Sequence, residues 1–205
     1  MNSLDREHYK RNGSNKYHID FNELEKNPNL IPLFFKKINK NDEIILQSII
    51  NNKSISENHK NIVVKIVKDY KTIEKEFKIS KFLKKENLSG FINYISLFNC
   101  YDNTYDNLNV GVEENLKIVL IMPYINEGSI RTFKWNKDKY NALKSILSQT
   151  IMSVFMAYHL RGFLHQELHL DNILIKKLKK KLLIINLKMK KIKIKLLILK
   201  LMVIK

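Results

Sequence analysis

Apolar residues follow strand-like spacing in some stretches of the chain and helix-like spacing in others. Residues 61–67 form a short run rich in β-branched side chains, and residues 116–122 form a second apolar run, so both are predicted to be buried strands. Residues 72–83 and 145–160 carry apolar side chains at helical spacing, which predicts two helices that each bury an apolar side. Residues 173–175 are again strand-like. The pattern therefore predicts a mixture of strands and helices.

A polar segment leads directly into the last of these strands. Within residues 164–175, His165, Glu167 and Asn172 stand at fixed offsets before three apolar residues. The segment resembles the catalytic loop of eukaryotic protein kinases, where His-Arg-Asp-Leu-Lys-x-x-x-Asn precedes a short apolar strand. In this resemblance His165 and Asn172 fall in register, and Glu167 stands where the family has its catalytic aspartate.

The resemblance implies a chemical role for two of these residues. Kinases place a carboxylate at the substrate hydroxyl and, five residues later, an amide on a Mg²⁺ ion that bridges the phosphates. Glu167 and Asn172 have that separation, so they would be the base and a metal ligand. Glutamate is one methylene longer than aspartate, which displaces the carboxylate by roughly an ångström and can cost about 10²-fold in rate. Any activity is therefore expected to be weak.

The same residues leave two other interpretations open. His165 and His169 stand four residues apart around a glutamate, as in some zinc sites. The zincin pattern, however, places glutamate directly after the first histidine on a helix and needs a third ligand, whereas Gln166 occupies that position. The remaining alternative is the end of a helix followed by a loop with polar residues that have no role.

Two residues upstream fit the nucleotide anchor of the kinase family, which is the pair of a strand lysine and a helix glutamate that positions the phosphates of ATP. Lys65 is the single charged residue in the strand at 61–67, and Glu76 follows eleven residues later on the next predicted helix. In kinases a strand lysine contacts the α- and β-phosphates and pairs with a glutamate of the following helix. The resemblance implies the same for Lys65 and Glu76. The alternatives are a lysine on an edge strand that points to water and a glutamate on a solvated helix face.

Residues 116–130 resemble the fifth kinase strand and the hinge that joins the two kinase lobes. The resemblance makes Met122 the gatekeeper beside the nucleotide and places Tyr124 in the hinge. Backbone groups at 123–125 would then hydrogen-bond adenine, and Val63 would lie over the adenine ring. These residues complete the expected ATP site.

Several departures from the family predict weak binding of both ATP and Mg²⁺. Kinases cover the phosphates with a glycine-rich loop, but no glycine occurs between Gly13 and Gly90, and residues 51–56 stand in place of the loop. Val63 replaces a smaller alanine over the adenine. Asn186 falls where the family has a metal-binding aspartate, and an amide binds a hard cation more weakly than a carboxylate does.

His169 widens the range of substrates. Ser/Thr kinases usually have lysine at this position, whereas aminoglycoside and choline kinases have histidine there. Residues 127–129 and 159–162 favour the protein-kinase branch. We therefore expect a Ser/Thr protein-kinase-like transferase that is truncated and inactive, with a protein as its substrate or partner. The alternatives are a pseudokinase that acts as a binding module and a small-molecule kinase of the aminoglycoside or choline type.

The C-terminal stretch has a restricted composition. Residues 176–205 contain 12 lysines and no Asp, Glu, Gly or Pro, so they hold 12 of the 17 net positive charges. We interpret this stretch as a frameshift or decayed end and expect it to lack packed structure. Alternatively, it contacts an anionic membrane surface or neutralises nucleic-acid phosphates. Nucleic acid is the unfavoured partner, because the rest of the chain is not strongly basic.

The chain is expected to have four parts in an α+β, protein-kinase-like fold. Residues 1–43 would be a partly disordered N-terminal extension, 44–124 an antiparallel-sheet lobe with one helix, 125–175 the beginning of a helical lobe, and 176–205 a basic tail. The apolar patch at 30–35 would dock on the sheet lobe.

Location can also be predicted from the sequence. Apolar runs are far shorter than the roughly 20 residues of a transmembrane helix, and the polar start lacks a signal-peptide core. Cys100 is the single cysteine, which fits a reducing compartment. The expected location is the cytoplasm.

Overall fold

A computed structural model describes most of the chain and divides it into two compact units. The described residues are 15–36, 38–67, 70–101, 116–135, 139–176, 183–189, 192–198 and 202–204. The first unit lies within Met1–Lys81 and Asn93–Tyr124, and the second within Phe82–Ile92 and Ile125–Lys205. Both the sheet and the helices belong to an α+β fold, as the sequence predicts. The disorder expected at residues 1–16 falls mostly on residues 1–14, which lie outside the described residues, whereas Asn15 and Lys16 belong to a strand.

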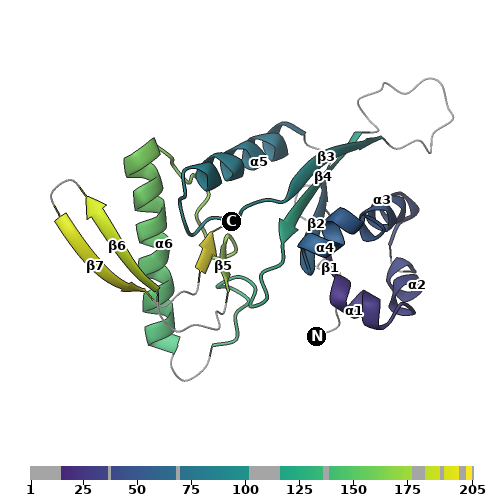
Figure 1. Cartoon of the computed structure of the whole chain (residues 1–205), viewed down its shortest axis with the longest axis horizontal. Helices are drawn as coiled ribbons and strands as arrows, with labels where there is room; N and C mark the ends of the chain where they lie inside the picture. Colours follow the sequence, from purple (N-terminus) through teal and green to yellow (C-terminus); the bar gives the residue numbers. More distant parts are fainter. Residues whose placement is uncertain are drawn as a thin grey trace. The chain divides into compact units, whose positions relative to one another are not determined.

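The first unit is built on a four-stranded antiparallel sheet with the order β1-β2-β4-β3 (Figure 1). Its strands are β1 (Asn15–Asp20), β2 (Asn61–Val67), β3 (Ser96–Tyr101) and β4 (Leu116–Pro123). β2 and β4 confirm the two strands predicted from the apolar runs, and they lie next to each other in the middle of the sheet. β-branched side chains favour this extended conformation because they pack well on a pleated surface.

The helices at the N-terminal end of the chain cover one face of this sheet. The helices of the unit are α1 (Phe21–Lys26), α2 (Leu30–Phe35), α3 (Lys40–Ile50), α4 (Lys53–Asn58) and α5 (Tyr70–Lys85), the last of which continues into the second unit. Alternate residues of β1, β2 and β4 form a core with apolar residues of α1, α2 and α3. Phe34 belongs to this core, so the predicted docking of the apolar patch at 30–35 is confirmed.

Two expectations about this part of the chain are wrong. The predicted boundary at residue 44 separates an extension from the sheet lobe, but β1 and helices α1 and α2 lie before it and share the core of the sheet. The region 44–124 also holds more than one helix, because most of α3 and all of α4 precede β2. The six-residue elements β1, α1 and α4 carry too few apolar positions to show a period.

A buried carboxylate ties α3 to the sheet. Asp42, in the first turn of α3, is 2% exposed. Its carboxylate accepts hydrogen bonds from Tyr17 Oη at 2.7 Å and Asn15 Nδ2 at 2.8 Å, both on β1. Asn39 Nδ2 donates at 3.0 Å, and Lys117 Nζ on β4 lies 3.1 Å away. The network joins the start of a helix to two strands.

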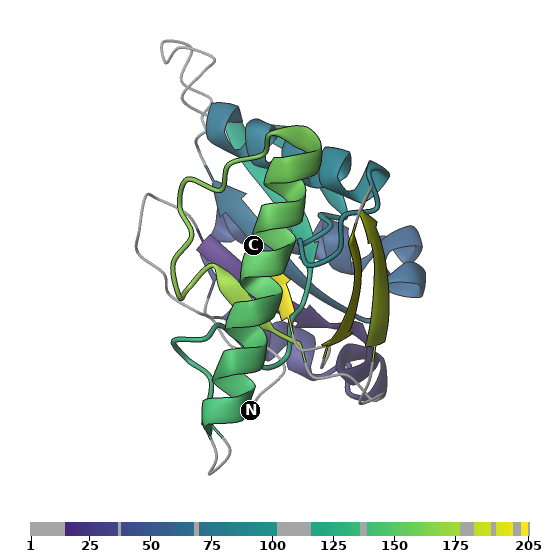
Figure 2. The same ribbon diagram turned by 90° about the vertical axis from the view of Figure 1, so that its left-hand side faces the viewer.

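The second unit contains a long helix and two small antiparallel sheets. Its elements are α6 (Lys139–Arg161), β5 (Ile173–Ile175), β6 (Leu183–Met189), β7 (Ile192–Ile198) and β8 (Met202–Ile204). β5 pairs with β8, and β6 pairs with β7 in a separate hairpin (Figure 2). Helix α6 and strand β5 confirm the elements predicted at 145–160 and 173–175. The expectation that the C-terminal stretch lacks packed structure is wrong for the residues in β6, β7 and β8.

The buried face of α6 carries two small and two larger side chains. The residues on this face are Ile146, Gln149, Thr150 and Ala157. A Cβ atom placed on Gly90 would lie 2.2 Å from Ser153 Oγ, which shows how closely the helix approaches the preceding segment. Large apolar side chains lie on the exposed side instead: Tyr140, Leu143, Leu147, Ile151, Phe155, Tyr158 and Leu160. The predicted burial of the large apolar side of this helix is therefore wrong for most of its residues.

The sequence predicts no transmembrane helix, and the helices of the structure can be compared with that prediction. Among the residues that the structure describes, no helix combines the length and the apolar character that crossing a membrane requires.

Candidate functional site

The residues predicted to contact a nucleotide lie mainly on the face of the sheet opposite the helix-covered core. Val63 pairs with Met122, and Lys65 pairs with Leu120, across the antiparallel β2–β4 ladder. Directly opposed residues of two strands point to the same side of a sheet. Their neighbours Ile62, Val64 and Ile66 point to the other side, into the core with α1–α3. The strand period therefore brings Val63, Lys65 and Met122 together on one face.

Lys65 and Glu76 form an ion pair on this face. Lys65 Nζ lies 3.9 Å from Glu76 Oε2, with the lysine side chain 13% exposed and the glutamate side chain 38% exposed. The predicted contact is thus present, at the long end of ion-pair distances. A pair this exposed is worth roughly 0.2–1 kcal/mol. The ion pair therefore matters more for orienting the Lys65 side chain than for the stability of the fold.

The expected hinge begins at the end of β4. The Tyr124 amide donates to the Asn61 carbonyl at 3.2 Å, which continues the ladder by one pair beyond Pro123. The pair Ile62–Pro123 is then a position without cross-strand hydrogen bonds, so proline loses none there. Because the Tyr124 amide is used within the sheet, it is unavailable to adenine. Contacts of adenine with the other backbone groups at 123–125 stay a prediction.

An aromatic pair covers the edge beside Val63. His18 is the residue of β1 that pairs with Val63. Its ring stacks on Tyr124, with the ring centroids 3.7 Å apart and the planes at 19°. His18 Nε2 also lies 3.1 Å from Asn61 Oδ1. Sequence reasoning missed this pair, because a single histidine in an Asn- and Lys-rich stretch gives no signal.

The segment expected in place of the phosphate loop is helical. Residues 51–56 include the turn after α3 and the first part of α4, whose N-cap Asn52 accepts a hydrogen bond from the Ile55 amide. A phosphate loop approaches its ligand with a glycine-rich backbone. Helix α4 has six residues and, together with α1, α2 and α3, forms the connection between the paired strands β1 and β2. The segment does not provide the expected phosphate loop.

The second part of the candidate site is the polar segment after α6. Gly162 ends the helix with φ of +66°, where its amide donates to the Tyr158 carbonyl at 2.7 Å. The bond of the Gly162 amide is that of an αL cap, and the Phe163 amide donates to the Ala157 carbonyl at 3.3 Å. The Phe163 ring then meets the His165 ring edge to face, with centroids 6.1 Å apart. The cap thus fixes where the polar segment at 164–172 begins.

The side chain of Asn172 closes this loop across five residues. Its Nδ2 donates to the Glu167 carbonyl at 2.9 Å and lies 3.0 Å from His169 Nε2. The Asp171 amide donates to His169 Nδ1 at 3.3 Å. Because a neutral imidazole has one acceptor nitrogen, only one of these two contacts to His169 forms in either tautomer. The side chain of Glu167 lies at the surface.

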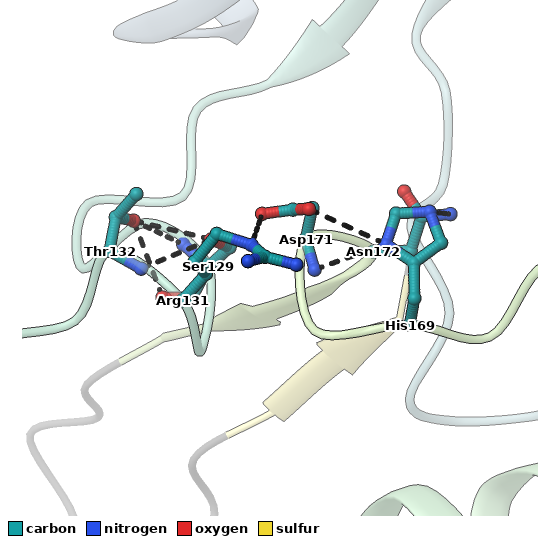
Figure 3. A network of polar contacts seen from close by, with 6 residues as sticks. All are labelled: Ser129, Arg131, Thr132, His169, Asp171 and Asn172. Atoms are coloured by element: carbon teal, nitrogen blue, oxygen red, sulfur yellow. Dashed lines mark hydrogen bonds and ion pairs between the residues drawn. The ribbon is translucent and has the colours of Figure 1, made fainter.

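Sequence reasoning missed an ion pair that holds the loop. Arg131 Nε donates to Asp171 Oδ1 at 2.7 Å, and Asp171 Oδ2 lies 3.6 Å from His169 Nδ1. Figure 3 shows the Asp171 carboxylate between the guanidinium and the imidazole, beside the Ser129–Thr132 turn. The only signal in the sequence was the position of Asp171 next to Asn172. A carboxylate already bound to arginine is a weaker candidate for a base or a metal ligand.

These residues do not fit a magnesium site. Mg²⁺ prefers carboxylate and phosphate oxygens in octahedral geometry. Asn172 donates its Nδ2 inside the loop, so only its amide oxygen could be a ligand, and β6, which carries Asn186, pairs with β7 rather than with β5. Across the described ranges, no three His, Cys, Asp or Glu residues gather closely enough to hold a metal ion. The same finding removes support from the zinc interpretation of His165 and His169.

Comparisons with known proteins do not identify a family for this chain. A scan against protein-family models finds no match to this chain, and a search of the curated proteins finds no significant match.

Proposed function

We propose that this chain is a protein-kinase-like domain of the Ser/Thr type that keeps a nucleotide anchor and has little or no phosphoryl-transfer activity toward proteins. The observation that carries the proposal is the ion pair between Lys65 on β2 and Glu76 on α5. In kinases the same pair, a strand lysine and a glutamate of the next helix, holds the α- and β-phosphates. Lys65 would therefore hold the phosphates of ATP, with Val63 and Met122 bordering the base.

The low activity follows from what surrounds this pair. A transferred phosphoryl group needs charge stabilisation and an aligned carboxylate. The ligands for Mg²⁺ do not fit, the phosphate loop is replaced by helix, and Glu167 is longer than the usual aspartate. Each departure weakens transfer more than it weakens binding of the phosphates to a lysine. A cytoplasmic location and a protein substrate or partner complete the proposal.

A second candidate function is a binding module without catalysis. The observation that favours it is the exposed side of α6, where Ile151 is 67% exposed and Tyr158 53%. Contiguous apolar surface of this kind marks sites of protein interaction more often than a single exposed residue does. The two candidates separate experimentally, because a binding module does not require Lys65.

The proposal is tested by the effect of ATP on thermal stability. If the Kd for ATP lies at or above the ATP concentration used, binding stabilises the folded state by at most about 0.4 kcal/mol and raises the Tm by at most roughly 1–2 °C. We expect a rise no larger than this, and we expect it without Mg²⁺, because the metal ligands do not fit. Lys65→Met should abolish the rise, whereas Lys53→Met on the exposed surface of α4 should leave it unchanged. A large rise that depends on Mg²⁺, or a rise that survives Lys65→Met, contradicts the proposal.

A further inference from the structure

A buried tyrosine fastens helix α5 at three points. The Tyr94 amide donates to Ser80 Oγ at 2.9 Å, and the Tyr94 carbonyl accepts from Lys81 Nζ at 2.7 Å. Its phenol donates to Glu76 Oε2 at 3.4 Å. Glu76 and Ser80 are four residues apart, so they lie on the same side of the helix. Tyr94 itself is 5% exposed, and it lies just before β3.

The contact with Glu76 involves the oxygen that faces Lys65. Glu76 Oε2 lies 3.4 Å from the Tyr94 hydroxyl and 3.9 Å from Lys65 Nζ. A half-exposed glutamate has many rotamers, and fixing one of them costs conformational entropy. A donor that is held rigidly by two backbone contacts reduces that freedom before any ligand arrives. The tyrosine therefore limits the directions in which the carboxylate can point.

The phenol is suited to remain a donor. Burial raises the pKa of Tyr94 well above its ordinary value, and the negative charge and hydrogen bond of Glu76 raise it further. The raised pKa therefore keeps the proton on the Tyr94 hydroxyl at neutral pH. A neutral hydroxyl donates a hydrogen bond to the Glu76 carboxylate, whereas a phenolate would repel that carboxylate.

We propose that Tyr94 is a positioning residue for the nucleotide anchor. By holding Glu76, Ser80 and Lys81 at once, it fixes the rotation of α5 so that the Glu76 carboxylate faces Lys65. The inference rests on the proposed function for what the ion pair is used for, while the contact itself lies within the first unit and can be measured without nucleotide. The contacts of Glu76 with Tyr94 and with Lys65 are both long, at 3.4 Å and 3.9 Å. A small rotation of α5 therefore decides whether Glu76 and Lys65 form their ion pair.

The test measures how fast Lys65 is acylated by an amine-reactive ester in the absence of nucleotide. A lysine ammonium beside a carboxylate keeps its proton and reacts slowly, so loss of the pair should speed acylation. The rate is read by peptide mass spectrometry for the full chain and divided by the rate of the exposed Lys53 in the same sample. Glu76→Gln should raise this ratio roughly twofold to fivefold, the change expected for a partly exposed ion pair. Tyr94→Phe should raise it by a similar factor.

A matched control separates positioning from general loss of stability. Tyr17→Phe removes another buried phenol that donates to a carboxylate in the same unit, Asp42 at 2.7 Å. It should lower the Tm without changing the reactivity of Lys65. Ser80→Ala, which removes a second contact of Tyr94, should raise the ratio in the same direction as Tyr94→Phe.

Each outcome decides the inference. An increase with Tyr94→Phe and not with Tyr17→Phe supports it, whether or not ATP stabilises the chain, so failure of the proposed function is seen separately. The inference is overturned if Glu76→Gln raises the ratio and Tyr94→Phe does not. It is also overturned if Glu76→Gln has no effect, since there is then no ion pair to position.

Discussion

Asp42→Asn is expected to lower the free energy of unfolding by about 3 kcal/mol, the usual cost of removing one partner from a buried charge network. The substitution leaves Lys117 beside a neutral amide, and the new amide group places a donor against the donors of Tyr17 and Asn15. The measurement is urea unfolding followed by circular dichroism at pH 7. As a control, Glu57→Gln on the exposed side of α4 should change the same quantity by less than about 0.5 kcal/mol.

The contribution of Asp42 should also depend on pH. Burial raises the pKa of Asp42, but the hydrogen bonds from Tyr17, Asn15, Asn39 and Lys117 outweigh burial and bring it below its ordinary value. A carboxylate with a lowered pKa in the folded state stabilises the protein fully above its unfolded pKa, which is about 4. This stabilisation is lost as the pH falls through the lower, folded pKa. The difference between the native chain and Asp42→Asn should therefore be constant from pH 7 to about 5 and shrink below about pH 4. A difference that grows on acidification would contradict the assigned network.

Glu167→Asp is expected to raise residual phosphate transfer by tenfold or more, up to about 10²-fold, because the shorter side chain restores the usual reach to the substrate hydroxyl. The absolute rate should stay near background, since the metal ligands and the phosphate loop are still absent. The measurement is incorporation of radiolabelled phosphate from ATP into a generic basic protein. Adding Asn186→Asp to this variant should raise the rate again, because it supplies a carboxylate for Mg²⁺.

Two further variants control for surface charge and for general damage. Glu57→Asp makes the same chemical change on an exposed helix and should leave transfer at the native level. Glu167→Ala should abolish any transfer. Robust activity of the native chain that Glu167→Ala leaves intact would refute both the assignment of the base and the low activity.

Much of the sheet could be predicted because its central strands have strong signals. β2 and β4 are short apolar runs, and a lysine inside such a run has to find a partner or reach solvent. The resemblance to kinases indicated Glu76 as the partner of Lys65, and the structure places the two charged groups 3.9 Å apart. The same reasoning could not reveal Tyr94, because the hydrogen bond to Glu76 depends on how the segment before β3 passes over α5.

The N-terminal part shows where sequence patterns fail. Tyr17 and Ile19 are the two buried apolar residues of β1, too few to distinguish a strand from the polar residues around them. Asp42 looks like any acidic residue in an Asn- and Lys-rich stretch, although it is almost fully buried. Its partners come from elements far apart in the sequence, such as Lys117, 75 residues later. Long-range polar contacts of this kind leave no local period.

Helix α6 could be predicted, but its buried side could not. Its apolar residues surround the helix, so the pattern does not select one face. Close packing against the segment at Gly90 favours small side chains such as Thr150 and Ala157 on the inside. The larger Ile151 and Phe155 remain exposed. Because the larger Ile146 and Gln149 are buried as well, neither side-chain size nor hydrophobicity alone identifies the buried face.

The central claim is that Lys65 holds nucleotide phosphates, and an acyl-phosphate derivative of ATP tests it most directly. Such a reagent transfers its acyl group to the lysine next to the phosphates, and peptide mass spectrometry identifies the modified residue among all lysines of the chain. The account predicts that Lys65 is the residue labelled fastest, that excess ATP suppresses its labelling, and that Glu76→Gln lowers the ability of ATP to compete. Labelling of Lys65 no faster than that of exposed Lys53, with no protection by ATP, would contradict the claim.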